Sequence, residues 1–246
     1  MCNRHAVLST PKLVLLPGLH GTEDLLGPFL AALPSEARYA IVQYSSPLRS
    51  DYFECEAAAR EALPPSEPYV LVGESFSGPV AISIASAKPP GLCGIVLVGS
   101  FAAAPSPMLK YLAPLISRLP MNRLAGRFMA TSLLGSSASS ELRRSVRDVI
   151  AQMSPSMIGG RVRALSRVDV TENLRRITIP VLYLRATRDR LVPPQCAQQM
   201  MRLSSQVRLI DLDGPHMLLS CAPHECARAI VTFAHGCQAY VIESKA

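Results

Sequence analysis

Six short apolar runs, each followed by turn residues and then by a helical pattern, constrain the fold of this chain more than any other feature. The runs are Leu13–Leu16, Tyr39–Val42, Tyr69–Gly73, Gly94–Val98, Val181–Leu184 and Val207–Ile210. Runs that are apolar on both faces and are separated by helices are typical of buried parallel strands. We therefore predict an α/β fold whose mostly parallel sheet of about six strands is flanked by helices.

Helical patterns fill the intervals between these runs. They cover residues 23–33, 52–63, 76–88, 195–203 and 223–234. Pro79 and Pro223 stand where the first turn of a helix accepts proline. About half of the residues are apolar (49%), so a chain of 246 residues can build one sizeable core.

The segment 102–176 interrupts the alternation of strands and helices. It contains no clear strand, and helical patterns cover residues 108–118, 123–133 and 141–152. We predict that this segment is a helical cap inserted into an α/β core formed by residues 1–101 and 177–246. An insertion that is merely tolerated and has no function is the alternative.

The cysteines and the N-terminus bear on the location of the protein. Seven cysteines are an odd number and show no regular spacing, which favours a reduced, intracellular protein. The N-terminus has neither a long apolar stretch nor a convincing cleavage site. The run Leu13–Leu16 is far too short to span a bilayer. We predict a cytoplasmic protein.

The stretch from Tyr69 to Gly78 is the most informative for chemistry. An apolar strand leads into Gly-Glu-Ser-Phe-Ser-Gly, and a helical pattern begins at once. Such a sharp turn leaves Ser75 exposed at the carboxyl end of the sheet and requires small residues two positions before and after it. Gly73 and Ser77 are small. The pattern alone is weak, and an ordinary strand-to-helix turn is the alternative, but the strand and helix that the motif requires are both present.

A serine hydroxyl needs a base that is itself oriented by an acid. On this scaffold the acid and then the histidine follow the serine along the chain. His216 comes directly after the last predicted strand, and Asp189 comes after the preceding one. We predict a catalytic triad of Ser75, Asp189 and His216. The alternative for Asp189 is a solvated loop residue paired with Arg188 or Arg190.

An oxyanion hole requires backbone N–H groups aimed at the reaction intermediate. We expect one from Phe76, directly after the nucleophile, and the second from Leu19 in the glycine-containing loop 16–22. His20 is a candidate for the pocket, as a donor or as lining, although a solvent-facing turn residue explains it equally well. Ser77 is a second candidate for the pocket.

From about Leu13 to the C-terminus the chain resembles the α/β-hydrolase superfamily. The motifs that carry the resemblance are Leu16-Pro-Gly-Leu-His-Gly-Thr22, Gly73-Glu-Ser-Phe-Ser-Gly78, Thr187-Arg-Asp-Arg-Leu-Val-Pro193 and Asp213-Gly-Pro-His216. In size and helical cap it is similar to small bacterial carboxylesterases and thioesterases, including the pimeloyl-acyl-carrier-protein methyl ester esterases. The chain departs from the pattern at Ser77, where the family usually has glycine.

The resemblance implies a serine hydrolase that cleaves a carboxylic ester or thioester through an acyl-enzyme on Ser75. Dehalogenases and epoxide hydrolases of this fold resemble each other in having an aspartate at that position. The mechanism requires no cofactor. An acyltransferase with the same triad is one alternative, and a non-catalytic binding module that retained the fold is another.

The positive charge is concentrated in the segment 102–176, where twelve basic residues face only four acidic ones. This excess accounts for the formal net charge of +7 of the whole chain. A basic cap could attract an acidic carrier protein, the phosphates of coenzyme A or another anionic substrate. A solvated helical surface is the alternative. No recognition motif for nucleic acid accompanies the charge. Cys221, His224 and Cys226 supply too few ligands for us to expect a metal site.

Overall fold

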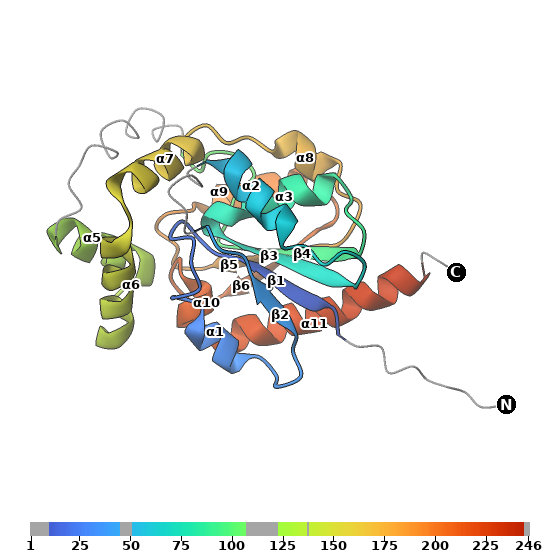
Figure 1. The fold of residues 1–246 in the computed structure, drawn as a ribbon, viewed down its shortest axis with the longest axis horizontal. Coiled ribbons are helices and arrows are strands. Elements are labelled where there is room, and N and C mark those ends of the chain that lie inside the picture. Colours follow the sequence, from blue (N-terminus) through green and yellow to red (C-terminus); the bar gives the residue numbers. More distant parts are fainter. Residues whose placement is uncertain (1–9, 45–50, 107–122, 137, 244–246) are drawn as a thin grey trace.

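The computed structural model of the protein describes residues 10–44, 51–106, 123–136 and 138–243 (Figure 1). Six strands form one sheet in the order β2-β1-β3-β4-β5-β6, and every neighbouring pair is parallel. The strands are β1 (Lys12–Leu16), β2 (Tyr39–Ile41), β3 (Tyr69–Glu74), β4 (Leu92–Val98), β5 (Val181–Ala186) and β6 (Val207–Leu212). Each predicted run coincides with one strand, so the predicted α/β fold is confirmed.

Helices cover both faces of the sheet (Figure 1). One face carries α2 (Tyr52–Glu61), α3 (Gly78–Ser86), α8 (Thr171–Arg175) and α9 (Pro194–Leu203). The other face carries α1 (Gly27–Ala32), α10 (Leu218–Cys221) and α11 (Pro223–Glu243). In the part of the chain that the structure describes, no helix is both long enough and apolar enough to cross a membrane.

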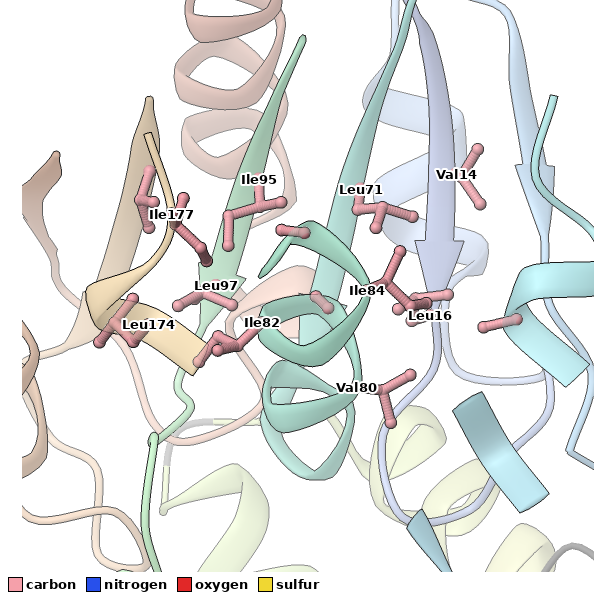
Figure 2. Packing of buried hydrophobic residues seen from close by; sticks show 14 of the residues in the cluster. Val14, Leu16, Leu71, Val80, Ile82, Ile84, Ile95, Leu97, Leu174 and Ile177 are labelled. Atoms are coloured by element: carbon pink, nitrogen blue, oxygen red, sulfur yellow. The ribbon is translucent and has the colours of Figure 1, made fainter. Parts of the chain in front are cut away.

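Alternate side chains of each strand enter two separate cores. Leu71 and Leu97 point into the core beneath α3, whereas Val70 and Val96 point into the core beneath α11. Figure 2 shows Val80, Ile82 and Ile84 of α3 packed against the strands. Full burial of one such side chain contributes about 1.5–3 kcal/mol. Helix α3 is therefore fixed firmly, and with it the turn that precedes it.

Three helices occupy most of the described part of the segment 102–176, and Figure 1 shows them beside the sheet rather than on its faces. They are α5 (Arg123–Leu134), α6 (Ser140–Gln152) and α7 (Pro155–Leu165). The helices α5 and α6 match the predicted helices 123–133 and 141–152. The predicted helix 108–118 lies outside the described residues. Ser139 and Ser154 cap α6 and α7 by accepting the N–H groups of Leu142 and Met157.

Apolar side chains of the cap segment pack against the core in more than one place. Apolar residues of α5 and α6 pack with Met217, next to His216, and with Leu25. The short helix α8, in contrast, contributes Leu174 to the core beneath α3. The division into a core and a cap at residues 102–176 stays a prediction.

Candidate active site

Strand β3 passes into α3 through a single 3₁₀ turn formed by Ser75–Ser77. Ser75 has a φ of 48°, in the left-handed region, which costs a residue other than glycine about 1 kcal/mol or more. The Ser100 hydroxyl donates to the Ser75 carbonyl over 2.7 Å and holds the turn from below. At Gly73 an added Cβ would lie 2.8 Å from the Ser77 carbonyl oxygen, so this position excludes side chains.

The structure brings Ser75, His216 and Asp189 together in one hydrogen-bonded chain. His216 Nε2 lies 2.8 Å from Ser75 Oγ, and His216 Nδ1 lies 2.7 Å from Asp189 Oδ2. The side chains of His216 and Asp189 are only 5% and 4% exposed. An ionised carboxylate only accepts, so Nδ1 carries the proton and Nε2 is free to accept the serine proton.

Asp189 is not the solvated loop residue that was the alternative. Its Oδ1 accepts the N–H groups of Leu191 and Val192 at 2.8 and 3.0 Å, while Oδ2 faces the imidazole. Arg188 instead forms an ion pair of 3.1 Å with Asp213. The Asp189 carboxylate is thus oriented by the loop that bears it.

Ser77 connects the nucleophile turn to the loop after β1. Its side chain is completely buried, and its hydroxyl donates to the Pro17 carbonyl and lies 3.4 Å from the Tyr44 hydroxyl. Ser77 therefore supports the nucleophile turn, and its place in the pocket stays a prediction. Position 78, rather than position 77, requires glycine, because a Cβ added at Gly78 would lie 1.7 Å from Ser100 Oγ.

The two residues predicted to form the oxyanion hole are both held by packing. The Phe76 ring is buried and stacks on the Tyr52 ring, with centroids 4.5 Å apart and 12° between the planes. Leu19 packs against the buried side chains Met153, Met157 and Ile158. Their backbone N–H groups are the donors that we continue to propose.

Two titratable groups lie at the loop after β1, the partly buried His20 and the buried Glu74, and the sequence analysis missed Glu74. An added Cβ at Gly18 would lie 3.5 Å from both Glu74 Oε2 and His20 Nδ1, so both side chains flank the loop. Within the described residues, neither Glu74 Oε2 nor His20 Nε2 has a hydrogen-bond partner. Burial raises the pKa of Glu74 and lowers the pKa of His20 to about 4. A glutamate at the end of an otherwise apolar strand run was the signal for Glu74.

The described cysteines form no metal-binding cluster at the site. In the ranges that the structure describes, no group of three or more His, Cys, Asp or Glu side chains could hold a metal ion. Burial raises the pKa of the Cys221 thiol to about 11 and that of Cys226 to about 12, so both stay protonated at neutral pH.

Solved structures with the same fold include several bacterial enzymes. A hydrolase from Oleispira antarctica superimposes with a TM-score of 0.79 at 16% identity, over 92% of this chain and 91% of that chain. The enol-lactonase from Burkholderia xenovorans LB400 gives 0.77 at 16%, over 96% and 93%. An esterase from Exiguobacterium antarcticum gives 0.77 at 16%, over 93% of each. At these identities the likeness shows the fold alone.

Sequence comparison shows the family. A search of curated proteins found no match. Residues 38–219 match the hydrolase family described as serine aminopeptidase, S33, and these residues include the nucleophile turn and the loops of Asp189 and His216. Because the match extends over more than half of the chain, this protein belongs to the serine aminopeptidase S33 family of α/β-hydrolases.

Proposed function

We propose that the protein is a serine hydrolase that cleaves a carboxylic ester or thioester through an acyl-enzyme on Ser75. The observation that carries this proposal is the unbroken hydrogen-bonded chain from Ser75 through His216 to Asp189. A strained turn presents the serine, a neutral imidazole faces its hydroxyl, and a buried carboxylate orients that imidazole.

In the first half of the reaction Ser75 Oγ attacks the acyl carbon and its proton passes to His216 Nε2. The π electrons of the carbonyl move onto its oxygen, which the N–H groups of Phe76 and Leu19 stabilise. When the intermediate collapses, the ester C–O or thioester C–S bond breaks and His216 returns the proton to the leaving group. The acyl group is then bonded to Ser75.

In the second half a water molecule takes the place of the departed alcohol or thiol. His216 accepts a proton from this water while the oxygen attacks the acyl carbon. The Ser75 Oγ–acyl bond breaks, the proton returns to Oγ, and a carboxylic acid leaves. Asp189 stays ionised throughout and stabilises the imidazolium that forms twice in each cycle.

An apolar acyl group suits the buried apolar cluster beside the oxyanion loop. Met153, Met157 and Ile158 pack together against Leu19 at the junction of the cap segment and the core. Methionine adapts its shape to irregular apolar partners. We propose that the acyl chain extends toward this cluster, so that esters of longer acids are preferred over acetate.

The charge of the cap segment supports an anionic leaving group or carrier. Arg147, Arg163 and Arg167 are exposed, and so is Arg144, which pairs with Asp148 over 3.7 Å. Arg143 bonds to carbonyl oxygens of its own segment. We propose that the exposed arginines attract substrates such as coenzyme A thioesters. Hydrolysis of a coenzyme A thioester should then slow at high salt far more than hydrolysis of a neutral ester of the same acid. Equal salt dependence would contradict this part of the proposal.

A fluorophosphonate probe tests the mechanism directly. Its phosphorus should become bonded to Ser75 Oγ with loss of fluoride, and mass spectrometry should find the label on that residue alone. Ser75→Ala should fold and remain unlabelled. Failure of the wild type to react with the probe and with a panel of p-nitrophenyl esters and acyl thioesters would overturn the proposal in favour of a binding module.

A further inference from the structure

Arg161 of helix α7 is completely buried, although it belongs to the most basic segment of the chain. A buried guanidinium requires acceptors for its N–H groups. Nη1 donates to the Leu19 carbonyl over 2.6 Å, and Nη2 donates to the Tyr44 carbonyl over 2.5 Å. The guanidinium also lies 6.0 Å from the centre of the Tyr44 ring. One side chain thus ties the cap segment to two loops of the core.

The turn from Gly18 to Gly21 is shaped around this guanidinium. Gly21 has a φ of +79°, and an added Cβ there would lie 2.6 Å from Arg161 Nη1 and 2.9 Å from Nη2. The turn is closed by the Gly21 N–H, which donates to the Gly18 carbonyl over 3.0 Å, and the Tyr44 N–H donates to the Gly21 carbonyl over 2.7 Å. The place where Gly21 excludes a side chain is the place that Arg161 fills.

Leu19, which Arg161 holds, is also the proposed second donor of the oxyanion hole. Its carbonyl is held by the guanidinium, and its side chain is held by Met157 and its neighbours in the cap segment. An oxyanion hole is effective because its donors are already in place when the charge develops. The buried guanidinium of Arg161 also adds a positive potential close to the proposed oxyanion hole.

We propose that Arg161 is a positioning residue that holds the Leu19 backbone so that its N–H faces the oxyanion. This inference rests on the proposed acyl-enzyme mechanism. It adds that stabilisation of the oxyanion depends on Arg161 of helix α7. The cap segment is then more than a cover over the pocket. It supplies the support for one side of the oxyanion hole.

The test compares two ketones that carry the same acyl chain. Ser75 Oγ adds to a trifluoromethyl ketone, its proton passes to His216, and the carbonyl oxygen becomes an oxyanion. The corresponding methyl ketone binds in the same place without forming the adduct. The ratio of their inhibition constants therefore reports on the oxyanion hole. In Arg161→Met we expect the preference for the trifluoromethyl ketone to fall about 10- to 100-fold, with the methyl ketone unaffected.

Three further variants separate positioning from general damage. Val149→Ala removes buried volume from the α5–α6 packing and should lower the melting temperature without changing the ratio. Arg161→Gln keeps one donor and should give an intermediate ratio, which also serves if Arg161→Met does not fold. A small alkylguanidinium added to Arg161→Ala should restore part of the ratio.

The outcomes distinguish this inference from the mechanism beneath it. If the wild type shows no preference for the trifluoromethyl ketone, the acyl-enzyme proposal itself is wrong. If the wild type shows the preference and a folded Arg161 variant keeps it, the positioning role is wrong and the mechanism stands.

Discussion

Asp189 binds His216 through one carboxylate oxygen only, because its other oxygen accepts the N–H groups of Leu191 and Val192. The carboxylate therefore cannot rotate without losing two backbone hydrogen bonds. This geometry determines what an amide would do at the same position. The oxygen of an asparagine would stay with the two backbone N–H groups, and its NH₂ group would face the imidazole.

Asp189→Asn should therefore inactivate the enzyme while leaving its fold intact. An amide that donates to His216 Nδ1 selects the wrong tautomer, with the proton on Nε2, and in serine proteases the corresponding change lowers kcat about 10⁴-fold. We expect a similar loss in ester hydrolysis with a melting temperature close to that of the wild type. Asp213→Asn, in the exposed pair with Arg188, is the matched control and should keep full activity. A loss of less than tenfold in Asp189→Asn would contradict the assignment of the acid.

The contact between Gly78 and Ser100 predicts a strong coupling between two substitutions. In Gly78→Ala the new Cβ would lie 1.7 Å from Ser100 Oγ and 2.6 Å from its Cβ, which should lower the free energy of unfolding by about 3 kcal/mol. Ser100→Gly removes both obstructing atoms and also the hydrogen bond to Ser75. In urea unfolding, the free energy of unfolding of the double variant should exceed the value expected from adding the two single losses by more than about 1 kcal/mol. Strict additivity would show that α3 shifts to relieve the contact.

The sheet and the positions of the three proposed triad residues were predictable because both depend on local patterns. Strands buried on both faces are continuous apolar runs. The loops that follow those strands place Ser75, Asp189 and His216 at the carboxyl end of the sheet. The nucleophile turn combines a strand, a small-residue motif and a helix within ten residues. No contact between distant residues was needed to identify it.

Arg161 and its partners could not be predicted in the same way. Its acceptors are carbonyl groups that lie 142 and 117 residues away, and a carbonyl has no sequence signature. In the sequence Arg161 stands two residues before Arg163, which is exposed, so the pair resembles the solvated face of a helix. A signal for α7 itself was present in Ser154-Pro155, which is an N-cap followed by proline at the first helical position.

Replacement of Glu74 by glutamine should stabilise the protein at alkaline pH. Burial raises the folded-state pKa of Glu74 above its ordinary value, so the folded protein is penalised as pH rises through that pKa and the carboxylate must ionise. Glu74→Gln removes this penalty. We expect its melting temperature to exceed that of the wild type at pH 8, and the difference to shrink toward pH 5.

Glu67→Gln is the control of opposite sign for this prediction. The Arg38 side chain lowers the pKa of Glu67, so its charged form is favoured in the folded protein. That variant should be slightly less stable than the wild type at pH 8. If Glu74→Gln showed the same direction as Glu67→Gln, the buried carboxylate would have a stabilising partner and the assigned pKa shift would be wrong.

The lowered pKa of His20 predicts a loss of stability in mild acid. Burial lowers its folded-state pKa from the ordinary 6.5 to about 4, so between these values the unfolded chain binds more protons than the folded protein. Stability from this group is therefore complete above pH 6.5 and is lost as pH falls toward 4. With about 1.4 kcal/mol for each pKa unit, and some residual solvent contact, the loss should be about 2 kcal/mol.

The measurement is the free energy of unfolding in urea from pH 7.5 to 4.5, in the wild type and in His20→Gln. Because glutamine does not titrate, the variant should lose less stability over this range, while the contribution of Glu74 is common to both proteins and cancels in the comparison. Parallel curves for the two proteins would mean that His20 takes up its proton in the folded state without cost, and that its side chain reaches solvent.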